Sequence, residues 1–165
     1  MHLTIQRACA INYAPRAELC RSRRNHTLEY LVSDLIDIEG IGHFHADKLA
    51  LFGIRTQAEF LAAAGTPSGR QKLVDGAGLT MDQVLTWANR ADLARIKGIG
   101  SEYADLLEAA GVDTVRELAQ RNPANLAPGL AAVNEEKILV RQLPTENEVT
   151  QWVAEAKALP RALFY

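Results

Sequence analysis

Cysteine, aromatic residues and long apolar runs are all scarce in this chain. Of its 165 residues only two are cysteines, Cys9 and Cys20, and 6% are aromatic. Two cysteines exclude a disulfide framework, and no set of cysteines and histidines has the spacing of a metal site. No apolar run approaches the roughly 18 residues of a membrane span. We therefore expect a cytoplasmic protein without a membrane-spanning segment.

The sequence motifs of common enzyme classes are missing as well. We find no nucleophile elbow, no phosphate-binding loop of the nucleotide hydrolases and no zinc-protease motif. His43 and His45 are two residues apart, and side chains at that spacing on a helix point about 200° apart, so they do not share one metal ion. The segment DGAG at 75–78 is typical of a helix end rather than a cofactor loop. We expect no catalysis, no cofactor, no metal site and no small-molecule substrate.

Hydrophobic residues, by contrast, make up 48% of the chain. A length of 165 residues suits one ordinary domain or two very small ones. Because aromatic residues are few, we expect a core of leucine, isoleucine, valine and alanine. Trp87 and Trp152 are expected to anchor that core, because each shares a helical face with valine and alanine residues.

Charge is unevenly distributed along the chain. Five of the 18 basic residues but only two of the 20 acidic ones lie in residues 1–30, so this segment carries +3 and the rest of the chain −5. We interpret residues 1–32 as a basic, disordered arm or as sequence upstream of the natural start. The acidic remainder, residues 33–165, is unfavourable for a protein that binds nucleic acid, because phosphate is attracted to basic surfaces.

The body of the chain contains one pattern twice. A shift of 58 residues aligns IEGIGHFHADKLALFGIRT, residues 38–56, with IKGIGSEYADLLEAAGVDT, residues 96–114. A shift of 65 residues then aligns Thr80, Val84 and Trp87 with Thr145, Val149 and Trp152. The second copy therefore has seven additional residues between these two regions. We place the first repeat at about 33–91 and the second at about 92–160.

Capping signals predict that both copies are helical. The capping-box pattern, threonine followed three residues later by Glu or Gln, occurs four times. It begins at Thr56, Thr80, Thr114 and Thr145. Thr66 and Asn122 each precede a proline, which suits the first turn of a helix, and Gly53 and Gly111 are typical of left-handed caps at helix ends. We predict helices at 33–38, 43–52, 57–64, 67–77, 81–91, 92–96, 101–110, 115–121, 123–132, 135–142 and 146–158, and no stretch alternates like a strand for long.

The two glycine turns resemble a known motif. The pattern apolar-x-Gly-apolar-Gly-x-x-x-Ala-x-x-Leu occurs at residues 38–49 and again at residues 96–107. It resembles the helix-hairpin-helix motif, and the longer pattern through GIRTQAEFL and GVDTVRELA is similar to an uncharacterised bacterial family with two such units. The resemblance covers residues 33–160. It implies an all-α fold in which tandem helix-hairpin-helix units, duplicated about a pseudo-two-fold axis, share one core.

The resemblance also implies a function, because the turn of many helix-hairpin-helix proteins binds the DNA backbone without reading sequence. Glycine allows a close approach, and amides at the start of the following helix form an anion site. The implied phosphate-binding residues are Gly40, Ile41, Gly42, His43, Lys48, Lys97, Gly98, Ile99, Gly100 and Ser101. We expect weak, nonspecific binding of double-stranded DNA with the second turn leading. The same turns also serve packing, with Ile41 and Ile99 entering the core.

Local charge keeps a second function open. Three acidic residues outnumber Lys48 around the first turn, whereas basic and acidic residues balance around the second. A backbone binder is expected to cluster lysine and arginine at its turns, because neutralising phosphate supplies most nonspecific affinity. The alternative is a protein–protein adaptor or assembly factor that uses the same fold without nucleic acid.

Overall fold

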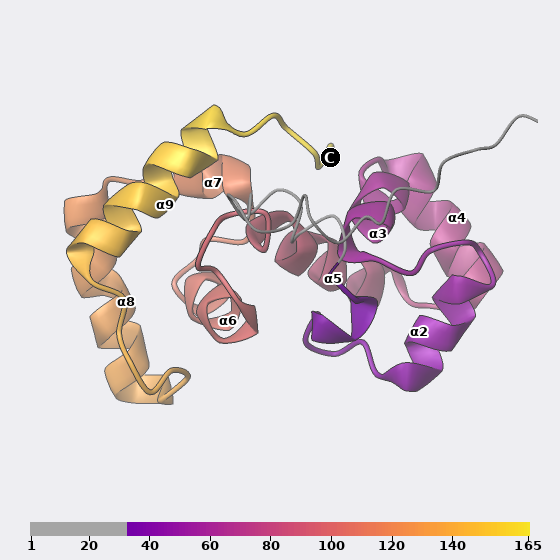
Figure 1. Ribbon diagram of the computed structural model, residues 1–165, viewed down its shortest axis with the longest axis horizontal. Coiled ribbons are helices and arrows are strands. Elements are labelled where there is room, and N and C mark those ends of the chain that lie inside the picture. Colours follow the sequence, from indigo (N-terminus) through magenta and orange to yellow (C-terminus); the bar gives the residue numbers. More distant parts are fainter. Residues whose placement is uncertain (1–32) are drawn as a thin grey trace, which may run out of the picture.

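The structure is a computed structural model that describes residues 33–165, so the basic segment 1–32 with both cysteines lies outside the described residues. Over the described range the chain forms eight α-helices, one short 3₁₀ helix and no strand (Figure 1). The elements are η1 (Leu35–Asp37), α2 (His43–Ala50), α3 (Gln57–Ala64), α4 (Pro67–Ala77), α5 (Met81–Leu93), α6 (Ser101–Ala109), α7 (Val115–Ala119), α8 (Pro123–Lys137) and α9 (Glu146–Ala158). No helix in this range is both long and apolar enough to cross a membrane. The helices and the lack of strands in residues 33–165 confirm the all-α prediction.

Six of the α-helices begin at the capping residues that the sequence indicates. In each case the side-chain oxygen of the capping residue accepts a hydrogen bond from a backbone amide in the first turn. These residues are Thr56, Thr66, Thr80, Thr114, Asn122 and Thr145. The box at Thr114 is only half formed, because the Glu117 carboxylate accepts from the amide of Asp113, at 2.9 Å, and not from that of Thr114.

Two of the predicted helix boundaries are wrong. In place of the separate helices predicted at 123–132 and 135–142 there is one helix, α8, which runs through Pro128 and ends at Lys137. Ile138 follows it in the left-handed region, with φ 51°, and residues 138–142 are not helical. The side-chain amide of Asn134 pairs with the backbone of Val140 just after the helix, at 3.1 and 2.9 Å. The separate helix predicted at 92–96 is also absent, since α5 continues to Leu93 and residues 94–97 form turns.

The buried hydrophobic residues form two clusters rather than the one shared core that we expected. The first cluster is built from residues 35–91 and the second from residues 93–156. Trp87 and Trp152 are buried in the first and the second cluster, as predicted. We call residues 33–91 the first half and residues 92–160 the second half. In the first half α3 packs on α5, and in the second α7 packs on α9.

The C-terminal segment 159–165 joins the two clusters. It leaves α9 and runs toward α3, where the C-terminus lies (Figure 1). Leu163 is 4% exposed and belongs to the first cluster, although it follows the second half in sequence. The amide of Phe164 donates to the carbonyl of Gly65 at 2.8 Å, and the buried Arg70 guanidinium donates to the carbonyl of Phe164 at 2.8 Å. This segment therefore ties the second half to the core of the first.

Candidate nucleic-acid interface

The two glycine turns have the same backbone geometry. The amide of Ile41 donates to the carbonyl of Ile38 at 3.0 Å, and the amide of Ile99 donates to that of Ile96 at 3.1 Å. Gly40 and Gly98 have φ values of 92° and 89°. Both turns thus need a residue with positive φ at the third position, where glycine is strongly favoured. Ile41 and Ile99 are buried, and because their amides close the turns, they do not offer a hydrogen bond to a ligand.

A tryptophan forms the floor of each turn. A Cβ atom at Gly40 would lie 2.8 Å from Nε1 of Trp87, and one at Gly98 would lie 3.3 Å from Nε1 of Trp152. The 65-residue shift aligns these two tryptophans. The first glycine of each turn is therefore required by its φ angle and by the indole beneath it. Its role is structural.

The second glycine of each turn, Gly42 or Gly100, is not required in this way. Gly42 and Gly100 have φ values of −82° and −93°, which any residue adopts, and a Cβ atom at either would meet nothing within 4 Å. Both residues are N-caps, of α2 and α6, and neither helix has a side-chain cap. The other six α-helices of the described range all use threonine or asparagine there.

As a result, backbone amides at the start of α2 and α6 are unpaired. We call the N–H groups of residues 42–44 and 100–102 the open amides. No hydrogen bond to an acceptor within residues 33–165 is formed by any of them, and all six residues are exposed. Three consecutive amides at a helix start, together with the helix dipole, form an anion-binding arrangement.

The charges at the two turns are exchanged. Glu39 in the first turn aligns with Lys97 in the second, and Arg90 on α5 aligns with Glu155 on α9. Arg90 Nη1 donates to the carbonyl of Glu39 at 2.7 Å, whereas the amide of Lys97 donates to Glu155 Oε2 at 3.1 Å. The backbone of each turn is thus hydrogen-bonded to a side chain whose charge is opposite to that of the turn residue it contacts. This support was not predicted, although the aligned pair of opposite charges is visible in the sequence.

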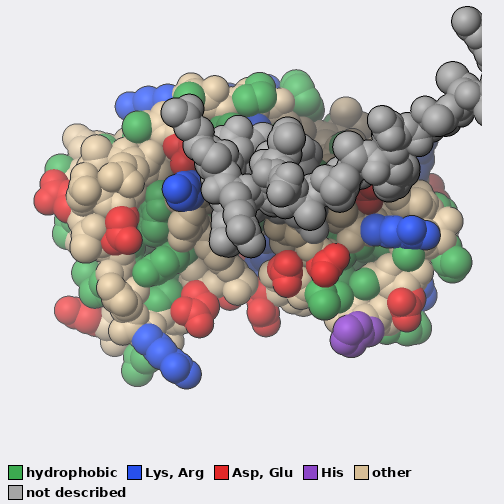
Figure 2. Space-filling view, in the orientation of Figure 1, with side chains coloured by type: hydrophobic (Ala, Val, Ile, Leu, Met, Phe, Trp, Pro, Cys, Tyr) green, Lys and Arg blue, Asp and Glu red, His purple; other side chains and the backbone are tan. Residues whose placement is uncertain are grey.

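The two turns face a common cavity of about 530 Å³. Asp37 and Glu39 line it from the first turn, and Gly100 and Ser101 line it from the second. Figure 2 shows acidic side chains gathered at the lower centre of the face that it displays. The open amides at the start of α6 therefore share a cavity with two carboxylates, which oppose the binding of a phosphate.

Arg90 is the basic residue among the described residues that line this cavity, and its guanidinium is already paired with carboxylates. Its Nη2 atom lies 2.6 Å from Asp105 Oδ1, an ion pair without hydrogen-bond geometry, and 3.4 Å from Glu108 Oε2. Burial raises the pKa of the Asp105 carboxyl, Arg90 opposes that rise, and Glu39 and Glu108 add to it. Arg90 is thus committed to holding α5 against α6.

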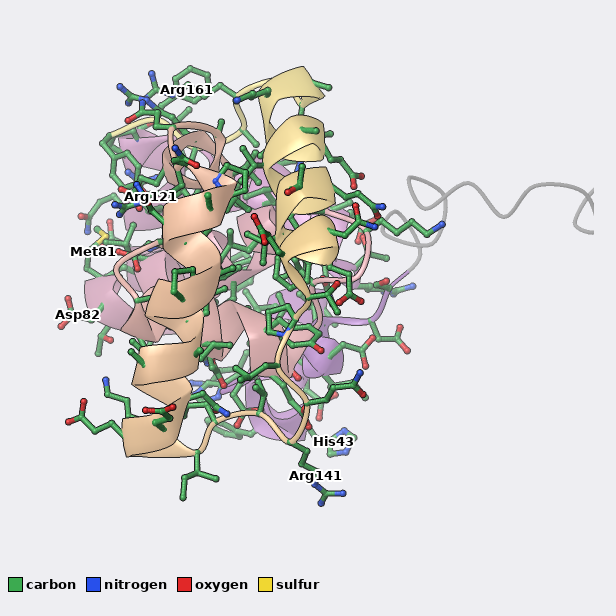
Figure 3. The ribbon with its side chains drawn as sticks, turned by 90° about the vertical axis from the view of Figure 1, so that its left-hand side faces the viewer. His43, Met81, Asp82, Arg121, Arg141 and Arg161 are labelled. Atoms are coloured by element: carbon green, nitrogen blue, oxygen red, sulfur yellow. The ribbon has the colours of Figure 1, made fainter. Side chains whose placement is uncertain are left out.

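The side chains of the remaining predicted site residues lie in two places, at the second turn and on α2. Lys97 and Ser101 are exposed beside the second turn. His43 is exposed at the lower edge of the molecule in Figure 3. Lys48 lies with its Nζ atom 4.5 Å from the centre of the Phe44 ring. Within residues 33–165 the structure therefore brings no cluster of lysine and arginine to either turn. Among the described residues, no group of three or more His, Cys, Asp and Glu side chains is placed to hold a metal ion.

Comparison with known proteins supplies a family. No curated protein and no solved structure matches the chain. A model of the family described as "Domain of unknown function (DUF4332)" matches residues 39–159, which span both turns and all eight α-helices of the described range. The chain therefore belongs to this family, the DUF4332 domain of unknown function.

Proposed function

We propose that residues 33–160 are two tandem helix-hairpin-helix units related by a pseudo-two-fold axis, and that their turns contact the phosphate backbone of double-stranded DNA. The repeated turn geometry and the tryptophan beneath each turn support the duplication. The contact is independent of base sequence, because backbone amides carry no information about bases.

The second glycine of each turn carries this proposal. Gly42 and Gly100 stand at two aligned helix starts, where the φ angle is ordinary and a side chain would meet nothing. Threonine or asparagine would cap these helices better than glycine by a few tenths of a kcal/mol. What a glycine offers instead is a close approach for a ligand to the open amides. A phosphate fits this arrangement, because it is anionic and accepts several hydrogen bonds.

The second turn leads the contact. It offers the exposed Lys97 where the first turn offers Glu39, and Ser101 adds a hydroxyl group. Asp37 and Glu39 in the shared cavity oppose phosphate, and residues 33–165 carry a charge of −5. We therefore expect the affinity at or beyond the weak end of the range of about 10⁻⁴ to 10⁻⁶ M that is typical of nonspecific binding.

A salt series of duplex-DNA binding with the full chain tests this function. Gly100→Ala and Lys97→Glu are expected to weaken binding several-fold at low salt, and Lys97→Glu to reduce the salt slope by about 1. Gly129→Ala is the matched control, because a Cβ atom at Gly129 on α8 also meets nothing within 4 Å. Equal affinities of the Gly100→Ala and Gly129→Ala variants, or no binding at all, would contradict the proposal.

A protein–protein adaptor is the second candidate. The observation that favours it is the acidic character of the body and of the cavity between the turns. Acidic surfaces repel phosphate but are compatible with protein partners. Recovery of a stoichiometric partner by the full chain from a native extract treated with nuclease would favour this candidate over the first.

A further inference from the structure

Helix α2 and the turn that follows it expose an apolar face. Phe44 is 67% exposed, Leu51 86% and Phe52 49%. Phe44, Lys48 and Leu51 follow one another at spacings of four and three residues, so they lie on one side of the helix, while Leu49 is fully buried on the other. We call Phe44, Lys48, Leu51 and Phe52 the α2 face. Exposure of three large apolar side chains so close together is unusual for a surface that has no partner.

The second half buries the central one of the aligned positions under a helix. The 58-residue shift aligns the α2 face with four residues of the second half, namely Glu102, Leu106, Ala109 and Ala110. Leu106 is fully buried, and α6 packs against α8, whose Leu126 and Leu130 belong to the same hydrophobic cluster. By contrast, α2 makes its main helix contact with η1. The first half therefore lacks the helix that would cover this position.

The lengths of the helices explain the difference. The helix that follows α3 is α4 with 11 residues, whereas the helix that follows α7 is α8 with 15. The end of α4 stops beside α2, where Lys48 Nζ lies 3.9 Å from the position of a Cβ atom at Gly78. The Phe52 ring lies 2.8 Å from such an atom at Gly76. The chain then turns away into α5, which leaves the α2 face open.

We propose that the α2 face docks an amphipathic helix of another protein. Its apolar residues, at spacings of three or four, would contact Phe44, Leu51 and Phe52 in the way that α8 contacts α6. Lys48 stands at the centre of the face with its ammonium group against the Phe44 ring. A carboxylate at the centre of the partner helix is the complement that this lysine requires, because docking removes it from water. The α2 face consists of side chains and shares only Phe44 with the open amides, which are backbone groups, and the docking proposal does not rest on DNA binding.

A second copy of this chain fits the α2 face less well. A two-fold interface places the same patch on both subunits, so Lys48 would meet Lys48 close to the axis. The α2 face of one copy could instead meet exposed aliphatic residues in the second half of another copy. These residues are Ile138 and Leu143, and they lie on the non-helical connection between α8 and α9. Neither surface offers a helix with a central carboxylate. The charge of the face thus selects a different protein.

Photocrosslinking in the cell tests this proposal. The full chain carries p-benzoylphenylalanine in place of Phe44, the cells are irradiated, and the crosslinked peptides are sequenced after nuclease treatment. The expected adduct is a segment of another protein with apolar residues at helical spacing and an aspartate or glutamate between them. Lys48→Glu is expected to reduce its yield about tenfold. Exchange of the partner carboxylate for lysine is then expected to restore the yield with the Lys48→Glu chain.

Two controls make the outcome decisive. The same crosslinker at Ile138, which is 80% exposed, is expected not to give this adduct. Lys48→Met keeps the apolar part of the side chain, and we expect it to retain more of the yield than Lys48→Glu. The proposal is overturned if adducts form only with a second copy or with residues 1–32 of the same chain, if both positions give the same adducts, or if the exchanged charges do not restore the yield.

Discussion

Gly40 and Gly42 stand two residues apart in the same turn, but different physical demands act on them. Gly40 has a φ of 92° and rests on Trp87, so the fold itself excludes other residues. Gly42 has an ordinary φ and open space around it. The same contrast recurs at Gly98 and Gly100. A glycine pattern is therefore a mixture of positions that make the turn and positions that leave its amides accessible.

Alanine at the first glycine is expected to destabilise the protein. Gly40→Ala should lower the free energy of unfolding by about 1–3 kcal/mol, because alanine is strained at this φ and its Cβ atom meets the indole of Trp87. Gly98→Ala should cost less, because the distance to Trp152 is 3.3 Å instead of 2.8 Å. Urea denaturation of both variants measures the difference, and a larger loss at Gly98 would contradict the assignment.

Asparagine at the second glycine is expected to stabilise the protein. Gly100→Asn should raise the free energy of unfolding by a few tenths of a kcal/mol, because its side chain can accept from an open amide of α6. The same change should weaken DNA binding by occupying that amide. Gly100→Ala is the control without an acceptor, and it should give no gain in stability. A variant that is stabilised and binds DNA as tightly as the wild type would show that the open amides are not used.

The stability of the protein is expected to depend on pH through Asp105. Its pKa in the folded state is raised from the ordinary value of 3.8, chiefly by burial. The folded protein therefore holds this proton more tightly than the unfolded chain, and stability falls as pH rises through the folded-state pKa. Asp105→Asn removes this dependence, so its stability relative to wild type should improve from about pH 3 to about pH 7. Urea denaturation across that pH range measures the difference in free energy of unfolding between the variant and the wild type. Asp82→Asn is the control for the loss of one negative charge. A fall in the relative stability of Asp105→Asn with rising pH would contradict the prediction.

Among the secondary-structure elements, those with local signals were predictable from the sequence. The starts of α3, α4, α5, α7, α8 and α9 follow from capping residues within three positions of the helix, and Gly53 and Gly111 have the positive φ expected of helix ends. The end of α8 was not predictable, because no capping pattern marks it. The helix is followed by Ile138 with a positive φ and by Val140, which pairs with the Asn134 side chain and is buried in the second cluster.

The candidate site was also predictable only in part, because some of its contacts join residues that are distant in sequence. The turn geometry follows from the glycine pattern, which is local. The support of each turn by Arg90 or Glu155 joins residues that are 51 or 58 positions apart. The acidic cavity also depends on how the two turns face each other. Sequence spacing does not fix such contacts. The excess of acidic residues around the first turn was visible in the sequence, but the cavity that brings Asp37 and Glu39 toward the second turn was not.

At the scale of the whole molecule, the C-terminal segment holds the two clusters together. It places Leu163 in the first cluster and satisfies both the Arg70 guanidinium and the carbonyl of Gly65. The ion pair of Arg90 on α5 with Asp105 on α6 is a second connection between the halves. The relative placement of the two turns therefore depends on both this segment and the contact of α5 with α6.

Loss of Leu163 is expected to destabilise the first cluster strongly. Leu163→Ala should cost about 2–4 kcal/mol, because it leaves a cavity in a buried site. Phe164→Ala, whose ring is on a residue 45% exposed, should cost less than half as much while keeping the same backbone hydrogen bonds. Chemical denaturation measures the free energy of unfolding of the two variants. A loss at Leu163→Ala no larger than that at Phe164→Ala would contradict the burial of Leu163 in the first cluster.

Chemical-shift mapping tests the central claim, that the open amides bind phosphate, most directly. In a titration of the isotope-labelled full chain with a short DNA duplex at low salt, the account predicts the largest backbone amide shifts at residues 42–44 and 100–102, with the second group leading. Gly100→Ala should reduce the shifts of that group, and raised salt should abolish all of them. Shifts confined to residues outside both turns, or none at low salt, would contradict the account.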